Sequence, residues 1–214
     1  MRKLLLLIQW EFKLQNKIYN QIKYISLFVL LYIFEIVFIS VDEIEKFLVL
    51  LPTIFIPMSL LSFIHLIFRD DISDGMLETM LSSSITPGEI IISKYCSVLL
   101  NSIISAILYL SLIYIMFNLT FYYFVAFSIL SFMMILLISS LLILIGSVQS
   151  YFRSNNSLIS LLLIPLMIPS FILTSLAFEQ DTFHMILMTF GINCIIIPVN
   201  FLLSGFLIKN IYNF

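Results

Sequence analysis

Long apolar runs separated by short polar segments dominate this chain. Six runs carry few or no charged residues and are long enough to cross a bilayer, because a spanning helix needs about 20 apolar residues. They lie near residues 22–40, 47–67, 90–117, 121–148, 157–178 and 184–208. The pattern predicts an all-α membrane protein with six transmembrane helices, forming a single domain over residues 1–214.

The composition agrees with this class. Hydrophobic residues make up 62% of the chain and charged residues only 10%, whereas soluble domains carry about 25% charged residues. No Pro-, Gly- or Ser-rich linker divides the sequence. A polytopic membrane protein with one membrane domain is therefore expected.

The distribution of basic residues predicts the orientation of the six runs. Only Lys46 lies on the opposite side. The other basic residues fall before the first run or on the same side as it, and they are Arg2, Lys3, Lys13, Lys17, Lys23, Arg69, Lys94, Arg153 and Lys209. The other loops are short and acidic, as with Asp42 and Glu179. By the positive-inside rule both termini are expected in the cytoplasm.

The N-terminal segment 1–21 has the pattern of a helix lying along the membrane surface. Leu7, Leu14 and Ile18 recur at helical spacing, and Lys13 and Lys17 are one turn apart. Its apolar core is too short for a signal peptide, so we expect the segment to be retained. The simpler alternative is a basic flank of the first span.

Six of the 22 charged residues fall between Arg69 and Glu89, and the sequence on both sides of this stretch is almost purely apolar. Charge is costly in hydrocarbon, so segment 69–86 is expected at a water-facing surface or against a protein partner. Asp70, Asp74 and Glu78 are four residues apart and would form one acidic stripe on a helix, with Ile72, Met76 and Met80 as an apolar stripe.

Two details refine the predicted structure of this segment. Gly75 is unfavourable inside a helix and indicates a bend or the close approach of another backbone. Thr86, Pro87 and Glu89 form a capping-box pattern, which places the start of the third span at this point. Helix capping by Asp70 and Asp71 is a structural alternative for part of the acidic stripe.

At these residues the sequence resembles a known family. The stretch FRDDISDGMLETML, followed by TPGEIIISK, is similar to the cytoplasmic loop of the haem exporter protein B (CcmB) family of the cytochrome c maturation system. The stretch LLLIPLMIPSFILTSLA, with Pro165 and Pro169, resembles its fifth span, and Ile197-Pro198 fits the sixth. The resemblance covers essentially the whole chain.

The resemblance implies the permease subunit of a type-2 ABC exporter in a bacterial or organellar inner membrane, with two copies per complex. Its implied partners are the ATPase CcmA, the membrane proteins CcmC and CcmD and, indirectly, the haem chaperone CcmE. The implied role is either haem export or ATP-driven release of the haem-loaded chaperone, and ATP acts through the ATPase. Carried over by position, the ATPase-coupling residues are Arg69, Asp70, Asp71, Asp74, Gly75, Leu77 and Glu78.

No pattern points to catalysis by the chain itself. A GxxxxGK[ST] phosphate loop is absent, so any ATP hydrolysis belongs to a partner. His65, His184 and Glu35 are potentially functional polar residues in or near spans, and neither histidine is assigned to a site. Cys96 and Cys194 are far apart and form no metal or redox motif.

Two other functions stay open on the residues alone. One is a permease for a different lipid, polysaccharide or drug cargo, and the other is a structural assembly subunit of a respiratory complex.

Overall fold

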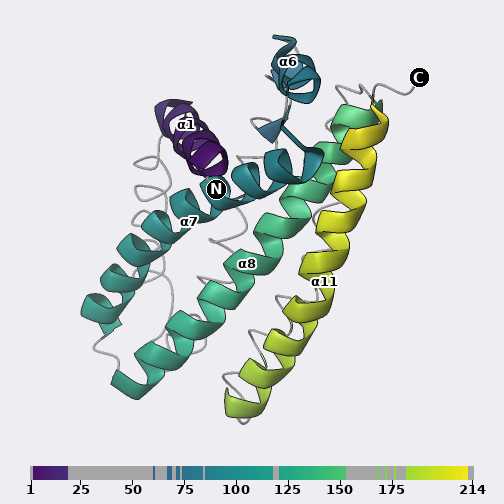
Figure 1. The fold of residues 1–214 in the computed structure, drawn as a ribbon. Coiled ribbons are helices and arrows are strands. Elements are labelled where there is room, and N and C mark those ends of the chain that lie inside the picture. The colour runs from purple at the N-terminus through teal and green to yellow at the C-terminus, as the bar shows by residue number, and fades with distance from the viewer. Residues whose placement is uncertain are drawn as a thin grey trace.

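The structure is a computed structural model, and it describes residues 2–18, 60, 67, 68, 71, 72, 74–83, 85–117, 121–152, 168, 172, 176 and 182–211. Its helices are α1 (Arg2–Ile18), α6 (Met76–Ser82), α7 (Pro87–Phe117), α8 (Phe121–Phe152) and α11 (Thr182–Asn210). None of the described residues lies in a β-strand. The expectation of an all-α chain is met throughout this part (Figure 1).

Three long helices lie side by side and form the body of the molecule. Helices α7, α8 and α11 have 31, 32 and 29 residues, so each is about 45 Å long, more than the roughly 30 Å of a bilayer core. They contain the predicted spans 90–117, 121–148 and 184–208. The predicted spans 22–40, 47–67 and 157–178 lie almost entirely outside the described residues.

Helix α8 is the central helix of this body, and α11 lies against it at the periphery (Figure 1). Both have the length and apolar composition of a membrane-crossing helix, over Phe124–Phe152 and Phe183–Asn210. Within the most apolar part of each, 72% of α8 but only 17% of α11 is buried. Most of the α11 surface is therefore apolar and exposed, as with Leu202 and Phe206, which suits a helix that faces lipid.

Polar side chains join α8 to α11 inside this apolar body. The Asn200 amide donates a hydrogen bond to the Ser140 hydroxyl at 3.0 Å, and the Asn193 amide donates to the Met133 carbonyl at 2.9 Å. Because lipid competes equally for apolar surface, interhelical hydrogen bonds and close packing hold membrane helices together. These bonds set how α11 is seated on α8.

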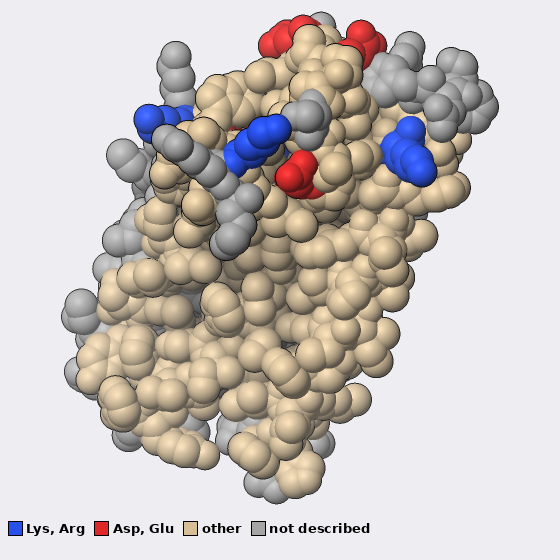
Figure 2. Space-filling view, in the orientation of Figure 1, with Lys and Arg blue, Asp and Glu red and all other residues tan. Residues whose placement is uncertain are grey.

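The short helices α1 and α6 lie at one end of the long-helix body. The N-terminal end of α7 and the C-terminal ends of α8 and α11 meet at the same end (Figure 1). On the face shown in Figure 2, the charged residues in blue and red gather at this end, and the other residues that the structure describes are tan. We call it the charged end of the molecule.

Candidate functional site at the charged end

Helix α6 lies at the charged end and begins later than the sequence pattern predicts. Gly75 has φ 68° and ψ 13°, a left-handed conformation that other residues rarely adopt, and α6 begins at Met76. No neighbouring atom lies within 4 Å of a Cβ built on Gly75. The glycine therefore makes a bend and does not accommodate another backbone.

This bend overturns the predicted acidic stripe. Asp74 lies in the turn before Gly75, whereas Glu78 lies in the first turn of α6, so the two are not on one continuous helix. The predicted apolar stripe does face the protein: Met80 is buried, and Ile72 and Met76 are half-buried against the core. Asp71 precedes the bend and is not in the first turn of α6, so capping of that helix does not explain it.

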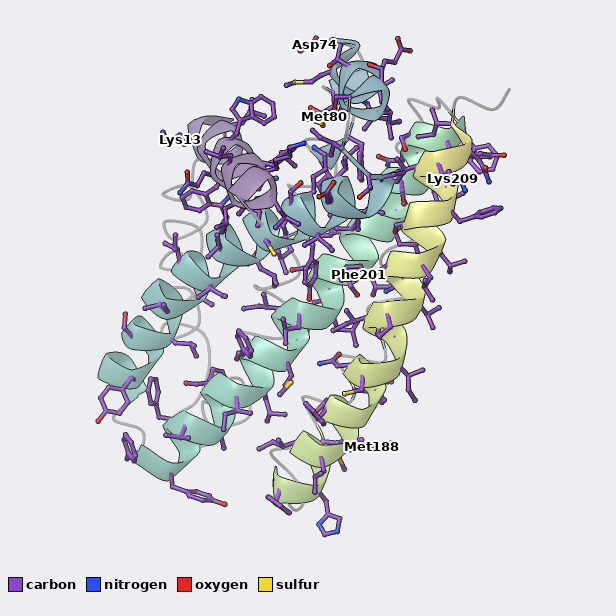
Figure 3. All side chains as sticks on the ribbon, in the orientation of Figure 1. Lys13, Asp74, Met80, Met188, Phe201 and Lys209 are labelled. Carbon is purple, nitrogen blue, oxygen red and sulfur yellow. The ribbon has the colours of Figure 1, made fainter. Side chains whose placement is uncertain are left out.

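Helix α6 is anchored by apolar side chains and presents a polar surface. Leu77 is fully buried and Met80 is 6% exposed, and both join the core with Ile90 and Ile91 of α7. Glu78 and Thr79 are exposed on the other side of α6, and Asp74 is exposed in the turn before it. Figure 3 shows Asp74 at the outer edge of the charged end and Met80 below it, toward the bundle.

The start of α7 has the hydrogen bonds of a capping box. The Thr86 N–H donates to Glu89 Oε2 at 2.8 Å, and the Glu89 N–H donates to Thr86 Oγ1 at 3.3 Å. The bond from the Thr86 backbone holds the pKa of Glu89 below its usual value. Pro87 is the first residue of α7, and α6 ends at Ser82, so only residues 83–86 separate the two helices.

A buried ion triad lies beneath α6. Lys94 Nζ of α7 is 2.9 Å from Glu11 Oε1 of α1 and also forms an ion pair with Asp71. The side chains of Lys94 and Glu11 are 1% exposed and that of Asp71 is 6% exposed. The triad therefore joins three segments that are far apart in the sequence.

The charges of the triad do not balance. Two carboxylates face one ammonium group, which leaves one surplus negative charge in a region shielded from water. Burial raises the pKa of Glu11 above its usual value; the Lys94 ammonium opposes this shift and the Asp71 carboxylate adds to it. The Phe68 ring, 5.2 Å from Lys94 Nζ, gives the ammonium a further favourable neighbour.

A second polar contact joins α1 to α7. The Asn101 amide donates a hydrogen bond to Gln15 Oε1 at 3.2 Å, and both side chains are buried. Glu11 and Gln15 are one turn apart on α1, so they lie on one face. Helix α1 therefore packs on α7 through a polar face, whereas Leu5, Leu6 and Trp10 are exposed. The sequence pattern did not predict this arrangement.

The chain before Asp71 is packed tightly against α8. A Cβ built on Gly146 would lie 2.9 Å from Phe68 Cδ2 and 3.5 Å from Ile67 Cγ2. Both side chains are almost fully buried. Glycine at position 146 thus allows Phe68 to lie directly on α8 and beside Lys94.

The structure separates the seven predicted coupling residues into different roles. Asp74 and Glu78 are exposed, and Gly75 provides the bend. Asp71 and Leu77 are buried and anchor the segment. A role of these two residues in coupling to an ATPase stays a prediction. Arg69 and Asp70 lie outside the described residues.

The other residues noted in the sequence do not join this site. His184 is exposed near the start of α11, at the end of that helix opposite the charged end, and His65 and Glu35 lie outside the described residues. Cys96 is partly buried in α7 and Cys194 is exposed on α11. Among the described residues, no three His, Cys, Asp or Glu side chains are grouped to hold a metal ion.

Sequence reasoning missed the triad because it treated Lys94 as one more cytoplasmic basic residue. Two signals were present: Glu11 and Gln15 share a helix face, and Lys94 and Asn101 are seven residues apart, two turns along the third span. Each spacing predicts a polar stripe on an otherwise apolar helix. Neither indicates that the two stripes face each other.

Comparisons with known proteins place the chain in a family. A family model described as CcmB protein matches residues 2–209. An uncharacterized protein of Rickettsia prowazekii (strain Madrid E) is 39% identical over 214 residues, covering 100% of this chain and 99% of the relative. An uncharacterized protein of Rickettsia conorii (strain ATCC VR-613 / Malish 7) is 37% identical with the same coverage. The chain therefore belongs to the CcmB family, the integral membrane subunits of the ABC transporter for cytochrome c maturation.

Proposed function

We propose that this chain is the six-span permease subunit of a type-2 ABC exporter complex, required either for haem export or for ATP-driven release of the haem-loaded chaperone CcmE. The complex would contain two copies of the chain together with the ATPase CcmA, CcmC and CcmD, in a bacterial inner membrane or its organellar counterpart. Haem is the proposed cargo, and ATP would act through CcmA.

The proposed coupling to an ATPase is supported by the two different sides of α6, one exposed and one buried. Glu78 is exposed on α6, whose buried side is anchored by Leu77 and Met80, and Asp74 is exposed in the turn just before this helix. When a partner displaces a surface helix that is anchored in this way, the displacement is transmitted to the core, because protein interiors are closely packed. The acidic surface suits a basic patch on the ATPase.

The charged end supports a cytoplasmic position for α6. Figure 3 shows Lys13 of α1 and Lys209 of α11 at this end. Basic residues favour the cytoplasmic side of a membrane protein. Both termini and the docking surface would then face the same compartment as ATP.

Reversing the charges of α6 is expected to weaken binding of the ATPase. In Asp74→Lys/Glu78→Lys, the affinity for CcmA should fall roughly tenfold, because two exposed charge pairs are each worth up to about 1 kcal/mol and would become repulsive. Co-purification and titration with CcmA in detergent measure this loss. Ser82→Lys, which adds a positive charge to the same exposed helix but removes no carboxylate, is the matched control. Equal affinity in all three proteins would show that α6 is not the docking surface.

Deletion of the gene tests the biological role. Cells without this chain should lose c-type cytochromes and retain b-type cytochromes, which need haem but no covalent attachment. Spectra of membranes before and after complementation measure both classes. Loss of both classes, or of neither, would favour a different cargo or a structural role in a respiratory complex.

Reconstitution distinguishes the two proposed uses of ATP. Proteoliposomes that contain the chain, CcmA, CcmC and CcmD are supplied with ATP, and haem inside the vesicles and free CcmE are followed together. Haem accumulation indicates export, and CcmE release without haem transfer indicates the chaperone cycle. If ATP hydrolysis changes neither quantity, the proposed function is wrong.

A further inference from the structure

The buried ion triad contains one carboxylate more than charge neutrality requires. Either Glu11 or Asp71 alone would neutralise Lys94, and burying the second carboxylate adds a desolvation cost. Each carboxylate belongs to a different element, α1 or the segment just before α6. The two ion pairs therefore join both α1 and the segment before α6 to α7. Neutralisation of Lys94 needs only one of these pairs and does not account for the other.

Backbone hydrogen bonds connect α6 to the segment that contains Asp71, which is paired with Lys94. The Ile72 N–H donates to the Phe68 carbonyl, the Gly75 N–H to the Ile72 carbonyl and the Thr79 N–H to the Gly75 carbonyl, at 3.1–3.2 Å. Asp71 lies within this hydrogen-bonded stretch. A displacement of α6 can thus reach Asp71 through these hydrogen bonds, and Asp71 is paired directly with Lys94 of α7.

We propose that the Asp71–Lys94 ion pair is the positioning contact that passes movement of α6 to α7, and that the Glu11–Lys94 pair holds α1 without being needed for that transmission. This inference rests on the proposed function, because the movement originates in the ATPase. Lys94 and Asp71 act here by position and touch neither nucleotide nor cargo.

Two matched variants separate the contacts. Asp71→Leu removes the pair between the α6 segment and α7, and Glu11→Met removes the pair between α1 and α7. Each leaves Lys94 with one carboxylate, so the remaining pair is neutral and the change in charge is the same. Asp71→Glu restores the carboxylate and serves as the conservative variant.

The readout is the position of α7 relative to α11 in the assembled complex. Spin labels are placed at the exposed positions Ile107→Cys and Leu202→Cys, in a background with Cys96→Ser and Cys194→Ser. The distance between labels is measured with bound CcmA, before and after trapping with ATP and vanadate. We expect trapping to shift this distance in the labelled protein with an intact triad, in Glu11→Met and in Asp71→Glu. In Asp71→Leu we expect no shift. Asp71→Leu should still bind CcmA.

The outcomes distinguish this inference from the proposed function. An equal shift in Asp71→Leu and Glu11→Met overturns the inference alone, because α7 then moves without the ion pair. Loss of CcmA binding in Asp71→Leu also overturns it, since the pair would then serve docking. If the labelled protein with an intact triad neither binds CcmA nor responds to ATP, both the inference and the proposed function are overturned.

Discussion

Replacement of Lys94 by Met is expected to lower the free energy of unfolding by about 3–5 kcal/mol, because it leaves two buried carboxylates without a cation. Both are nearly inaccessible to water, and Glu11 already shows the cost of burial in its raised pKa. The midpoint of thermal or SDS unfolding in detergent micelles measures the loss. The long apolar side chain of Met preserves most of the volume of Lys, so the effect reports charge more than packing.

Two further variants test the electrostatic explanation. Lys94→Arg keeps the positive charge and should remain close to the original stability. Glu11→Met/Asp71→Leu/Lys94→Met removes all three charges together and should recover much of what Lys94→Met alone loses, since apolar replacement of a complete buried ion cluster is often neutral. A triple variant as unstable as Lys94→Met would show that packing, and not unpaired charge, causes the loss.

Gly146→Ala is expected to destabilise the protein by about 1–3 kcal/mol, the usual cost of overpacking a core. The new methyl group would lie 2.9 Å from the Phe68 ring, which is buried and cannot swing into solvent. Displacement of Phe68 would also disturb the neighbouring Lys94. Unfolding midpoints and the yield of assembled complex measure the effect.

Gly205→Ala is the matched control, because a Cβ at that position meets Ile91 Cδ1 at an ordinary 3.6 Å. Both substitutions replace a glycine within a membrane helix by the same residue, so gains in helix propensity of up to about 1 kcal/mol cancel in the comparison. Gly205→Ala should be neutral or stabilising. A second change, Phe68→Leu, should partly restore Gly146→Ala. If Gly146→Ala and Gly205→Ala behave alike, the close contact with Phe68 is not important for stability.

Local rules were sufficient for some elements of the charged end. The capping box at Thr86 and Glu89 depends on residues three apart, so its hydrogen bonds could be predicted from the sequence. The extent of α7, α8 and α11 follows from apolar length in the same way. Gly75 was recognised as a break in the pattern, but only the backbone shows that it is a left-handed bend that delays α6 to Met76.

The candidate site was less predictable, because charge in a sequence does not reveal burial. Asp71 and Asp74 have the same chemistry and lie three residues apart, yet Asp71 is buried against Lys94 and Asp74 is exposed. Helix α1 shows the same difficulty. Its apolar periodicity predicts a helix on a membrane surface, whereas its buried contacts with α7 are made by Glu11 and Gln15.

The sequence by itself determined the membrane class, the helical secondary structure and the acidic segment between two apolar runs. These properties follow from hydropathy and from interactions within one turn of a helix. Only the tertiary structure decided that Glu11, Asp71 and Lys94 meet. The reason is physical: an ion pair between segments 23 to 83 positions apart depends on how helices pack, and no local preference encodes that distance.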